Sequence, residues 1–325
     1  MNWPRPRVYL LTSVLGTAVL TACLRAPPSP VAADCGARES VQALAALLPP
    51  KQRENVIFID AAGDVSATRP ELRQLVVPMR SRGENRFAAP SGLSLRFAPC
   101  DAQTDRLSAQ SLPYSCFSEA GAAYRRLSSR DGFSYARATV RLPDPGTAGL
   151  NPATGAYVML GGRSPRSAEV DAGLVYSPTN RWWTSFVRRE NDKVFCLGDG
   201  CSNTVPPNRV RPGAVTLEFS VIAPECVALR TNDGARSYTV VVAAPGSGWA
   251  PGGAAQRLKR TTSLAGASKG DRLSNVGWRN VVIGTSEANA KPWADGQTER
   301  GGECVSGNVT VRAREDGEDI DLAYP

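Results

Sequence analysis

Short runs in which hydrophobic and polar residues alternate extend along most of the chain after residue 50. In SYARATVRL (134 to 142), the apolar residues occupy every second position: Ala136, Ala138, Val140 and Leu142. This period of two is typical of a strand with one buried face. Similar runs, broken by Gly, Pro and Asp, recur to the C-terminus, among them AEVDAGLVYS, RWWTSFVRRE and GNVTVRARE. The pattern predicts an all-β fold, an antiparallel β-sandwich or jelly roll.

Helical spacing of apolar residues is confined to two short segments. Residues 37–48, ARESVQALAALL, show it clearly and end at Pro49-Pro50, which cannot continue a helix. Residues 117–129, FSEAGAAYRRLSS, are the second candidate. We therefore expect one or two short helices beside a sandwich domain that covers residues 51–325.

The N-terminus has the layout of an export signal. Arg5 and Arg7 precede the apolar run VYLLTSVLGTAVL, which is shorter than an ordinary transmembrane helix. The run ends in Leu20-Thr21-Ala22-Cys23, a sequence that resembles the bacterial lipobox. The resemblance implies a signal peptide over residues 1–22 and a lipid-modified Cys23. The Pro- and Ala-rich composition after Cys23 predicts an extended tether, which with the short helix covers residues 23–50.

The lipobox also implies a location. Acyl chains on Cys23 would anchor the protein stably, since each buried methylene contributes about 0.8 kcal/mol. We expect an extracytoplasmic lipoprotein of the bacterial cell envelope. Leu24 stands where an aspartate would act as an inner-membrane retention signal in some bacteria, so the outer membrane is favoured.

Composition narrows the chemistry. The net charge of +8 becomes +6 when Arg5 and Arg7 are removed with the signal peptide, which favours anionic partners such as an acidic polysaccharide. The basic residues are scattered and match no nucleic-acid motif, so no nucleic-acid partner is expected. The chain has no histidine, which excludes Ser-His-Asp triads, histidine bases and histidine-ligated metals.

Seven cysteines follow Cys23, and an exported chain of this kind is expected to be disulfide-bonded. From their spacing we expect Cys196 to pair with Cys201, Cys100 with Cys116 and Cys226 with Cys304, which leaves Cys35 unpaired. No metal site or cofactor is predicted. A structural calcium in the Gly198-Asp199-Gly200 loop is the alternative, with fewer carboxylates than calcium loops use.

Glu169-Val170-Asp171 lies on a predicted strand that an aromatic-rich strand follows. Together with YARATVRLP, this order resembles the concanavalin A-like lectin and glucanase sandwiches, in which family 16 glycoside hydrolases carry a Glu-x-Asp-x-Glu strand. The resemblance implies Glu169 as nucleophile and Asp171 as its orienting partner. The acid/base glutamate would fall at Gly173 or Leu174, neither of which donates a proton, so the family's mechanism is incomplete here.

Glu169 and Asp171 are themselves a candidate catalytic pair. Residues two apart on a strand share a face, so their carboxylates approach each other and one pKa rises. The alternative is that both acids are simply solvated on an exposed face. The choice between the two is open at the level of sequence.

The neighbouring residues fit carbohydrate binding. Trp182 and Arg188 fall on one face of their strand and Trp183 on the other, so one indole is expected to line a glycan groove. A polysaccharide lyase using Tyr176, Asn180 and Arg188 is an alternative. The resulting hypothesis is a lipoprotein that binds a polysaccharide on the concave face of its sandwich; a glycan-active enzyme and a structural lipoprotein without ligand are the alternatives.

Overall fold

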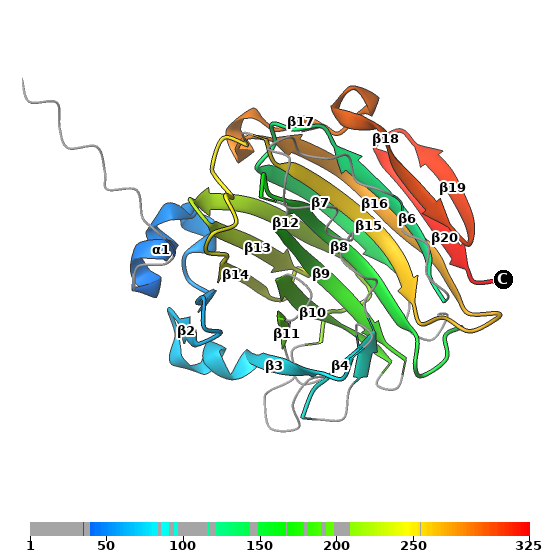
Figure 1. Cartoon of the computed structure of the whole chain (residues 1–325), viewed down its shortest axis with the longest axis horizontal. Coiled ribbons are helices and arrows are strands. Elements are labelled where there is room, and N and C mark those ends of the chain that lie inside the picture. The colour runs from blue at the N-terminus through cyan, green and yellow to red at the C-terminus, as the bar shows by residue number, and fades with distance from the viewer. Residues whose placement is uncertain are drawn as a thin grey trace, which may run out of the picture. The chain divides into compact units, whose positions relative to one another are not determined.

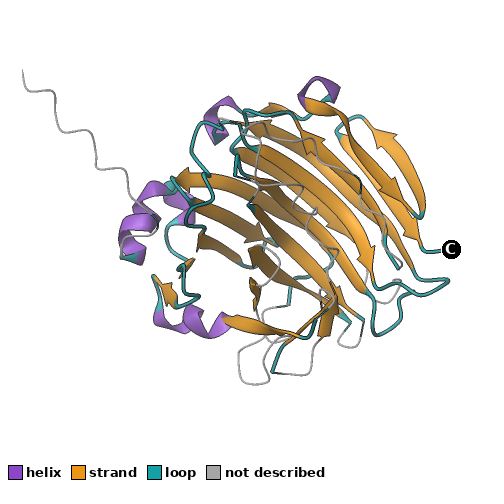
Figure 2. Cartoon of the chain, viewed as in Figure 1, coloured by secondary structure: helices purple, strands orange, loops and turns teal. Residues whose placement is uncertain are grey.

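Two β-sheets packed face to face make up most of the chain in this computed structural model (Figures 1 and 2). The structure describes residues 35, 40–83, 86–90, 94–96, 116, 121–143, 149–166, 168–178, 181–189, 193–197, 209–253 and 255–325. These all belong to one unit, Ala33–Pro325. The predicted signal peptide and Cys23 lie outside the described residues.

Sheet A and sheet B each contain ten of the described strands. In spatial order, sheet A consists of β19 (Asn308–Arg314), β20 (Gly317–Ala323), β16 (Arg272–Gly284), β7 (Tyr135–Leu142), β12 (Gly213–Ala223), β13 (Cys226–Asn232), β14 (Ser237–Ala243), β1 (Val56–Ile59) and β2 (Val65–Ala67), with β17 (Lys291–Pro292) beside β16. Sheet B consists of β18 (Thr298–Ser306), β6 (Ala123–Ser129), β15 (Arg257–Ala265), β8 (Gly155–Arg163), β9 (Glu169–Ser177), β10 (Trp182–Arg189), β11 (Lys193–Leu197), β3 (Val76–Ser81), β4 (Arg86–Ala88) and β5 (Ser94–Arg96). Among these strands only β1 and β14 pair in parallel.

The alternation seen in the sequence becomes the two faces of each strand. On β7, Ala136, Ala138, Val140 and Leu142 are buried in the core between the sheets, while Arg137 and Arg141 face outward. The prediction of an all-β sandwich is therefore confirmed. The predicted helix over 117–129 is wrong, since Ala123–Ser129 form β6, paired with β15 and β18. Hydrogen bonds to strands that are distant in the sequence make this segment a strand, although the local spacing of its apolar residues is helical.

The other predicted helix is present as α1 (Val41–Leu47), and the Ser40 side chain caps it by accepting from the Ala43 N–H. Short 3-10 helices complete the described elements: Pro50–Gln52, Pro70–Leu75, Glu287–Asn289 and Asp295–Gln297. Leu44 and Leu48 pack on the outer face of sheet A against Phe58 and Val241. The helix thus covers one end of that sheet (Figure 1). Among the described residues, no helix has the length and apolar character needed to cross a bilayer.

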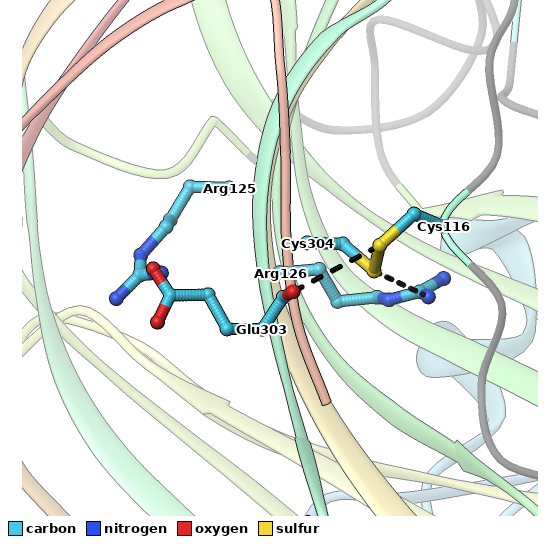
Figure 3. Close-up of a disulfide and its surroundings, with 5 residues drawn as sticks. All are labelled: Cys116, Arg125, Arg126, Glu303 and Cys304. Atoms are coloured by element: carbon cyan, nitrogen blue, oxygen red, sulfur yellow. Dashed lines mark hydrogen bonds and ion pairs between the residues drawn. A yellow bond between two sulfur atoms is a disulfide. The ribbon is translucent and has the colours of Figure 1, made fainter. Parts of the chain in front are cut away.

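The disulfides differ from the expected pairs. Cys35 pairs with Cys226, with a Cα–Cα distance of 5.4 Å, and Cys116 pairs with Cys304 at 5.3 Å (Figure 3). The expected Cys226–Cys304 and Cys100–Cys116 bonds are therefore wrong, and Cys35 is not left over. Cys196 is also disulfide-bonded, but Cys201 and Cys100 lie outside the described residues. The observed bonds tie residues 191 and 188 positions apart, a proximity that only the folded sheets create.

Apolar side chains cover both faces of sheet B. The main core lies between the sheets and includes Trp183, Trp249 and Trp278. A second cluster lies on the opposite face of sheet B and includes Met159, Val175 and Phe186. Because β10 is covered on both sides, alternation alone does not say which of its tryptophans is buried.

We predict that Trp183→Ala lowers the free energy of unfolding by about 3–5 kcal/mol, because it empties a fully buried site. Trp182 is partly exposed and lies under Arg209, whose Cζ is 3.7 Å from the ring centroid. Trp182→Ala should therefore cost only about 1 kcal/mol. Denaturant unfolding of both variants tests this, and equal losses would contradict the placement of Trp183 in the core.

Candidate functional site

Charged residues form a row across the face of sheet B that points away from sheet A. On β9, Val170, Ala172 and Leu174 turn into the core, so Glu169 and Asp171 occupy the opposite face. Pairing registers align one position from each of four successive strands β15, β8, β9 and β10: Lys259, Gly161, Asp171 and Arg188. The register thus brings a lysine and an arginine to either side of the predicted acid pair.

Lys259 holds both acids. Its Nζ donates a hydrogen bond to Glu169 Oε1 and lies 2.9 Å from Asp171 Oδ1. The exposed fractions are 4% for Glu169, 3% for Asp171 and 4% for Lys259. The interpretation of Glu169 and Asp171 as solvated surface acids is therefore wrong. Burial of this kind is tolerated only when the charges are paired.

Gly161 provides the space in which the lysine meets the acids. It lies between Lys259 and Asp171 in the register. A Cβ atom at this position would lie 2.7 Å from Asp171 Oδ1, closer than real Cβ atoms come. Any larger residue would displace the carboxylate that Lys259 contacts.

The two carboxyl groups differ in acidity. Burial opposes the ionisation of Glu169, but the positive charges of Lys259, Arg163 and Arg188 outweigh it and lower the Glu169 pKa. Burial raises the pKa of Asp171; Lys259 opposes this rise, and the Glu169 charge adds to it. Glu169 is therefore the ionised member of the pair, and Asp171 is the member that holds a proton more readily.

This arrangement does not suit glycoside hydrolysis. A retaining hydrolase places the scissile bond between its two carboxyl groups. Here the Lys259 ammonium group contacts both carboxyl groups, and both are buried. The pair is closed to a sugar in this structure.

The other predicted ligand-binding residues do not come together. Tyr176 and Trp183 pack against each other in the core, with ring centroids 5.4 Å apart. Arg188 is the register partner of Asp171 and shares with it the face of sheet B that points away from the core, whereas Tyr176 points into the core. The proposed lyase group of Tyr176 and Arg188 therefore does not form. Asn180 lies outside the described residues. Trp182 is the predicted aromatic residue that remains partly exposed.

A cleft of about 1010 Å³, which the sequence did not suggest, is lined largely by sheet A. Its walls carry four arginines, from β7, β13, β15 and β19, together with an indole and two acids: Arg137, Arg230, Arg260, Arg314, Trp293, Glu315 and Asp316. Arg137 and Arg314 are open to solvent, with side-chain exposures of 40% and 49%. The cleft therefore offers charged groups that a ligand can reach, whereas the predicted acid pair is buried.

Each arginine of the cleft is held by an acid. Arg137 lies 3.5 Å from Glu287, Arg230 lies 3.5 Å from Glu218, Arg260 lies 2.8 Å from Glu318 and Arg314 lies 2.7 Å from Asp319. A guanidinium has five N–H donors, so one carboxylate fixes its position and leaves donors over. The buried Arg260 Nε has no hydrogen-bond partner among the described residues. No cluster of three or more His, Cys, Asp or Glu suited to a metal is present in the part of the chain that the structure describes.

Comparisons with known proteins leave the family open. No protein-family model and no curated protein matches the chain. Scytalido-glutamic peptidase with a transition state analog inhibitor aligns over 63% of this chain and 99% of its own, with 8% identity and a TM-score of 0.42. SCP-B, an eqolisin peptidase in complex with a tripeptide, aligns over 63% of this chain and 99% of its own, with 9% identity and a TM-score of 0.38. An alginate lyase from Klebsiella pneumoniae aligns over 63% of this chain and 58% of its own, with 11% identity and a TM-score of 0.24. Scores this low carry no argument about activity.

We predict a pH-dependent contribution from Asp319, which anchors Arg314 at the cleft. Burial acts to raise its pKa, but hydrogen bonds from Arg279 and Arg314 lower it from 3.8 to about 2. A carboxyl group whose pKa is lower in the folded state stabilises the fold at pH values above its pKa in the unfolded state. This contribution is lost as the pH falls through its pKa in the folded state. Wild type should therefore be more stable than Asp319→Asn by a constant amount above pH 3.8, and the gap should close towards pH 2.

Denaturant unfolding across this pH range measures the gap. A gap that stays constant down to pH 2 would contradict the ion pairs of Asp319 as described.

Proposed function

We propose that the protein is a lipid-anchored protein of the bacterial cell envelope that binds an acidic polysaccharide in the arginine-lined cleft. The observation that carries the proposal is the presence of four arginines around one cleft, two of them exposed. Arginine pairs with a carboxylate through two parallel hydrogen bonds. A uronic acid or another acidic sugar presents the groups that such a surface recognises.

The dimensions of the cleft favour a chain over a single small ion. Three of its arginines, Arg230, Arg137 and Arg314, lie on β13, β7 and β19 of sheet A, and β13 and β19 are five strand-to-strand steps apart. At about 4.8 Å per step this distance is roughly 24 Å. The polar lining of Thr139, Thr216 and Asn280 adds groups that hydrogen-bond to hydroxyls. A linear polyanion with regularly spaced carboxylates would meet several of the arginines at once.

Binding is proposed in preference to catalysis because the residues expected to catalyse are buried, whereas arginines suited to binding are exposed in the cleft. The acid pair expected to act on a sugar is buried under Lys259. The exposed charges of the cleft are the guanidinium groups of Arg137 and Arg314 and the carboxylates of Glu315 and Asp316. The guanidinium groups stay protonated, so they can hold an anion but neither donate nor accept protons in catalysis.

The anchor is proposed from the lipobox-like Leu20-Thr21-Ala22-Cys23 sequence. Cys23 and Cys35 are separated by 11 residues that include three prolines, at 27, 28 and 30. The first described residue, Cys35, is buried and disulfide-bonded to Cys226. A tether of this length would keep the sandwich close to the membrane surface.

We predict that the full-length protein, purified in detergent, is retarded by a polyuronate in affinity electrophoresis and is not retarded by a neutral glucan. Arg137→Gln should weaken the polyuronate interaction about tenfold, which corresponds to about 1.4 kcal/mol for one charge-assisted contact. Added salt should weaken the wild-type interaction as well.

Arg312→Gln is the matched control. Arg312 is also an exposed arginine of sheet A, but it pairs with Asp321 and does not line the cleft. Equal loss of affinity in both variants, or equal retardation by the neutral glucan, would refute a specific role for the cleft.

For the anchor, we predict that Cys23→Ser moves the protein from the membrane fraction of its bacterial host to the soluble fraction. Thr21→Ser keeps a small residue in the lipobox-like sequence and should leave the protein in the membrane fraction. Membrane association of Cys23→Ser at the wild-type level would exclude lipid anchoring through this residue.

A further inference from the structure

We propose that Lys259 and Asp171 condense to form an intramolecular isopeptide bond, with Glu169 as the proton carrier. The bond would join β15 to β9 across β8. This inference goes beyond the proposed binding function and does not depend on it, because none of the three residues lines the arginine cleft.

The Lys259 amino group lies close to both carboxyl groups. The lysine Nζ lies 2.9 Å from an oxygen of the Asp171 carboxyl group and is hydrogen-bonded to Glu169. The strands β15 and β9 are two steps apart, roughly 9.6 Å, which the extended side chains of a lysine and an aspartate together cover. Gly161 lies between them in the register and has no side chain to obstruct the approach. The three reactive groups are therefore already in contact.

Lys259, Glu169 and Asp171 are buried together. All three side chains are at least 95% buried, with side-chain exposures of 5% for Lys259 and 4% for each acid. Charges held out of water are costly even when paired. The reaction replaces an ammonium, a carboxylate and a carboxylic acid by a neutral amide, a neutral carboxylic acid and a water molecule. The buried surroundings therefore favour the products over the ion pair.

The two acids differ in how readily they hold a proton. Glu169 is the ionised member, so it is able to take a proton from the Lys259 ammonium group to which it is bonded. Its second oxygen, Oε2, is buried and has no hydrogen-bond partner among the described residues, and a buried acceptor of this kind is costly to leave unsatisfied. Asp171 holds its proton more readily, and a neutral carboxyl group is the form that an amine attacks.

The step balances. Glu169 takes one proton from the ammonium group, and the freed lone pair of Lys259 Nζ attacks Asp171 Cγ to form the C–N bond. The nitrogen loses a second proton, the C–O bond to the Asp171 hydroxyl breaks, and this hydroxyl leaves as water with a proton relayed through Glu169. One proton stays on Glu169, so the total charge is zero before and after. Effective molarities of about 10⁵–10⁸ M for well-oriented groups make condensation in water feasible without a co-reactant.

Tryptic mapping of the reduced and denatured full-length protein tests the proposal. Trypsin cuts after Arg166, Arg181, Arg257 and Arg260, and an amide-linked Lys259 is not a cleavage site. We expect a branched peptide that joins residues 167–181 to residues 258–260. It should weigh one water molecule, about 18 Da, less than the sum of its two parts. Separate recovery of 167–181 and of a peptide ending at Lys259 would overturn the proposal.

Variants test the assigned roles. Tryptic digests of Asp171→Ala and Glu169→Gln should both yield the two peptides separately. Asp171→Ala lacks the carboxyl group that the amine attacks, and Glu169→Gln lacks the group that carries the proton. Glu303→Gln is the matched control, since Glu303 is a sheet B acid with a 57% exposed side chain, and it should keep the branched peptide. A link that forms to the wild-type extent in Glu169→Gln would overturn the mechanism. The wild-type map is decisive even if a variant folds poorly.

Discussion

The face of sheet B that points away from the core is organised around one ammonium group, that of Lys259. A buried charge is tolerated only when partners compensate for its lost hydration. Lys259 meets this condition through Glu169 and Asp171, and it reaches them because Gly161 leaves the intervening position empty. Removing one partner of such a buried group typically costs about 3–5 kcal/mol, because the other charge is left unpaired. The positions of the three strands β15, β8 and β9 are therefore tied to one contact.

The two sheets consequently have different outer faces. Sheet B buries its charged row together with a second apolar cluster, which suits a supporting role. Sheet A carries exposed arginines, which line a cleft. A strand motif that resembles the acidic strand of family 16 hydrolases is thus part of a closed, structural arrangement. The residues that would meet a ligand come mainly from sheet A, with Arg260 from β15 of sheet B.

Local sequence patterns predicted the parts of the fold that depend on local interactions. The period of two in β7 gave its buried face, and the spacing in α1 gave a helix that ends before Pro49. The segment that contains β6 was mispredicted, because its strand is stabilised by partners more than 100 residues away. Alternation placed Trp182 and Trp183 on opposite faces of β10 but did not identify the core face, since both faces are covered.

Long-range contacts account for what the sequence did not predict about the site. Glu169 and Asp171 were identified as a pair from their spacing, whereas Lys259 is 90 positions from Glu169 and belongs to no motif. The disulfide partners are still further apart in the chain. The cleft collects arginines from four strands that become neighbours only through the order of sheet A and its packing. No local pattern encodes these proximities.

The central claim is that Lys259 and the two acids form a closed unit and not an open catalytic pair. A high-resolution crystal structure tests it most directly through the distance from Lys259 Nζ to Asp171 Cγ. We expect the Lys259 nitrogen between the two carboxyl groups, either ion-paired with Asp171 Oδ1 at 2.9 Å as described or, where the proposed bond has formed, about 1.33 Å from Asp171 Cγ. A Lys259 side chain turned away from both carboxyl groups, with water between the acids, would contradict the account.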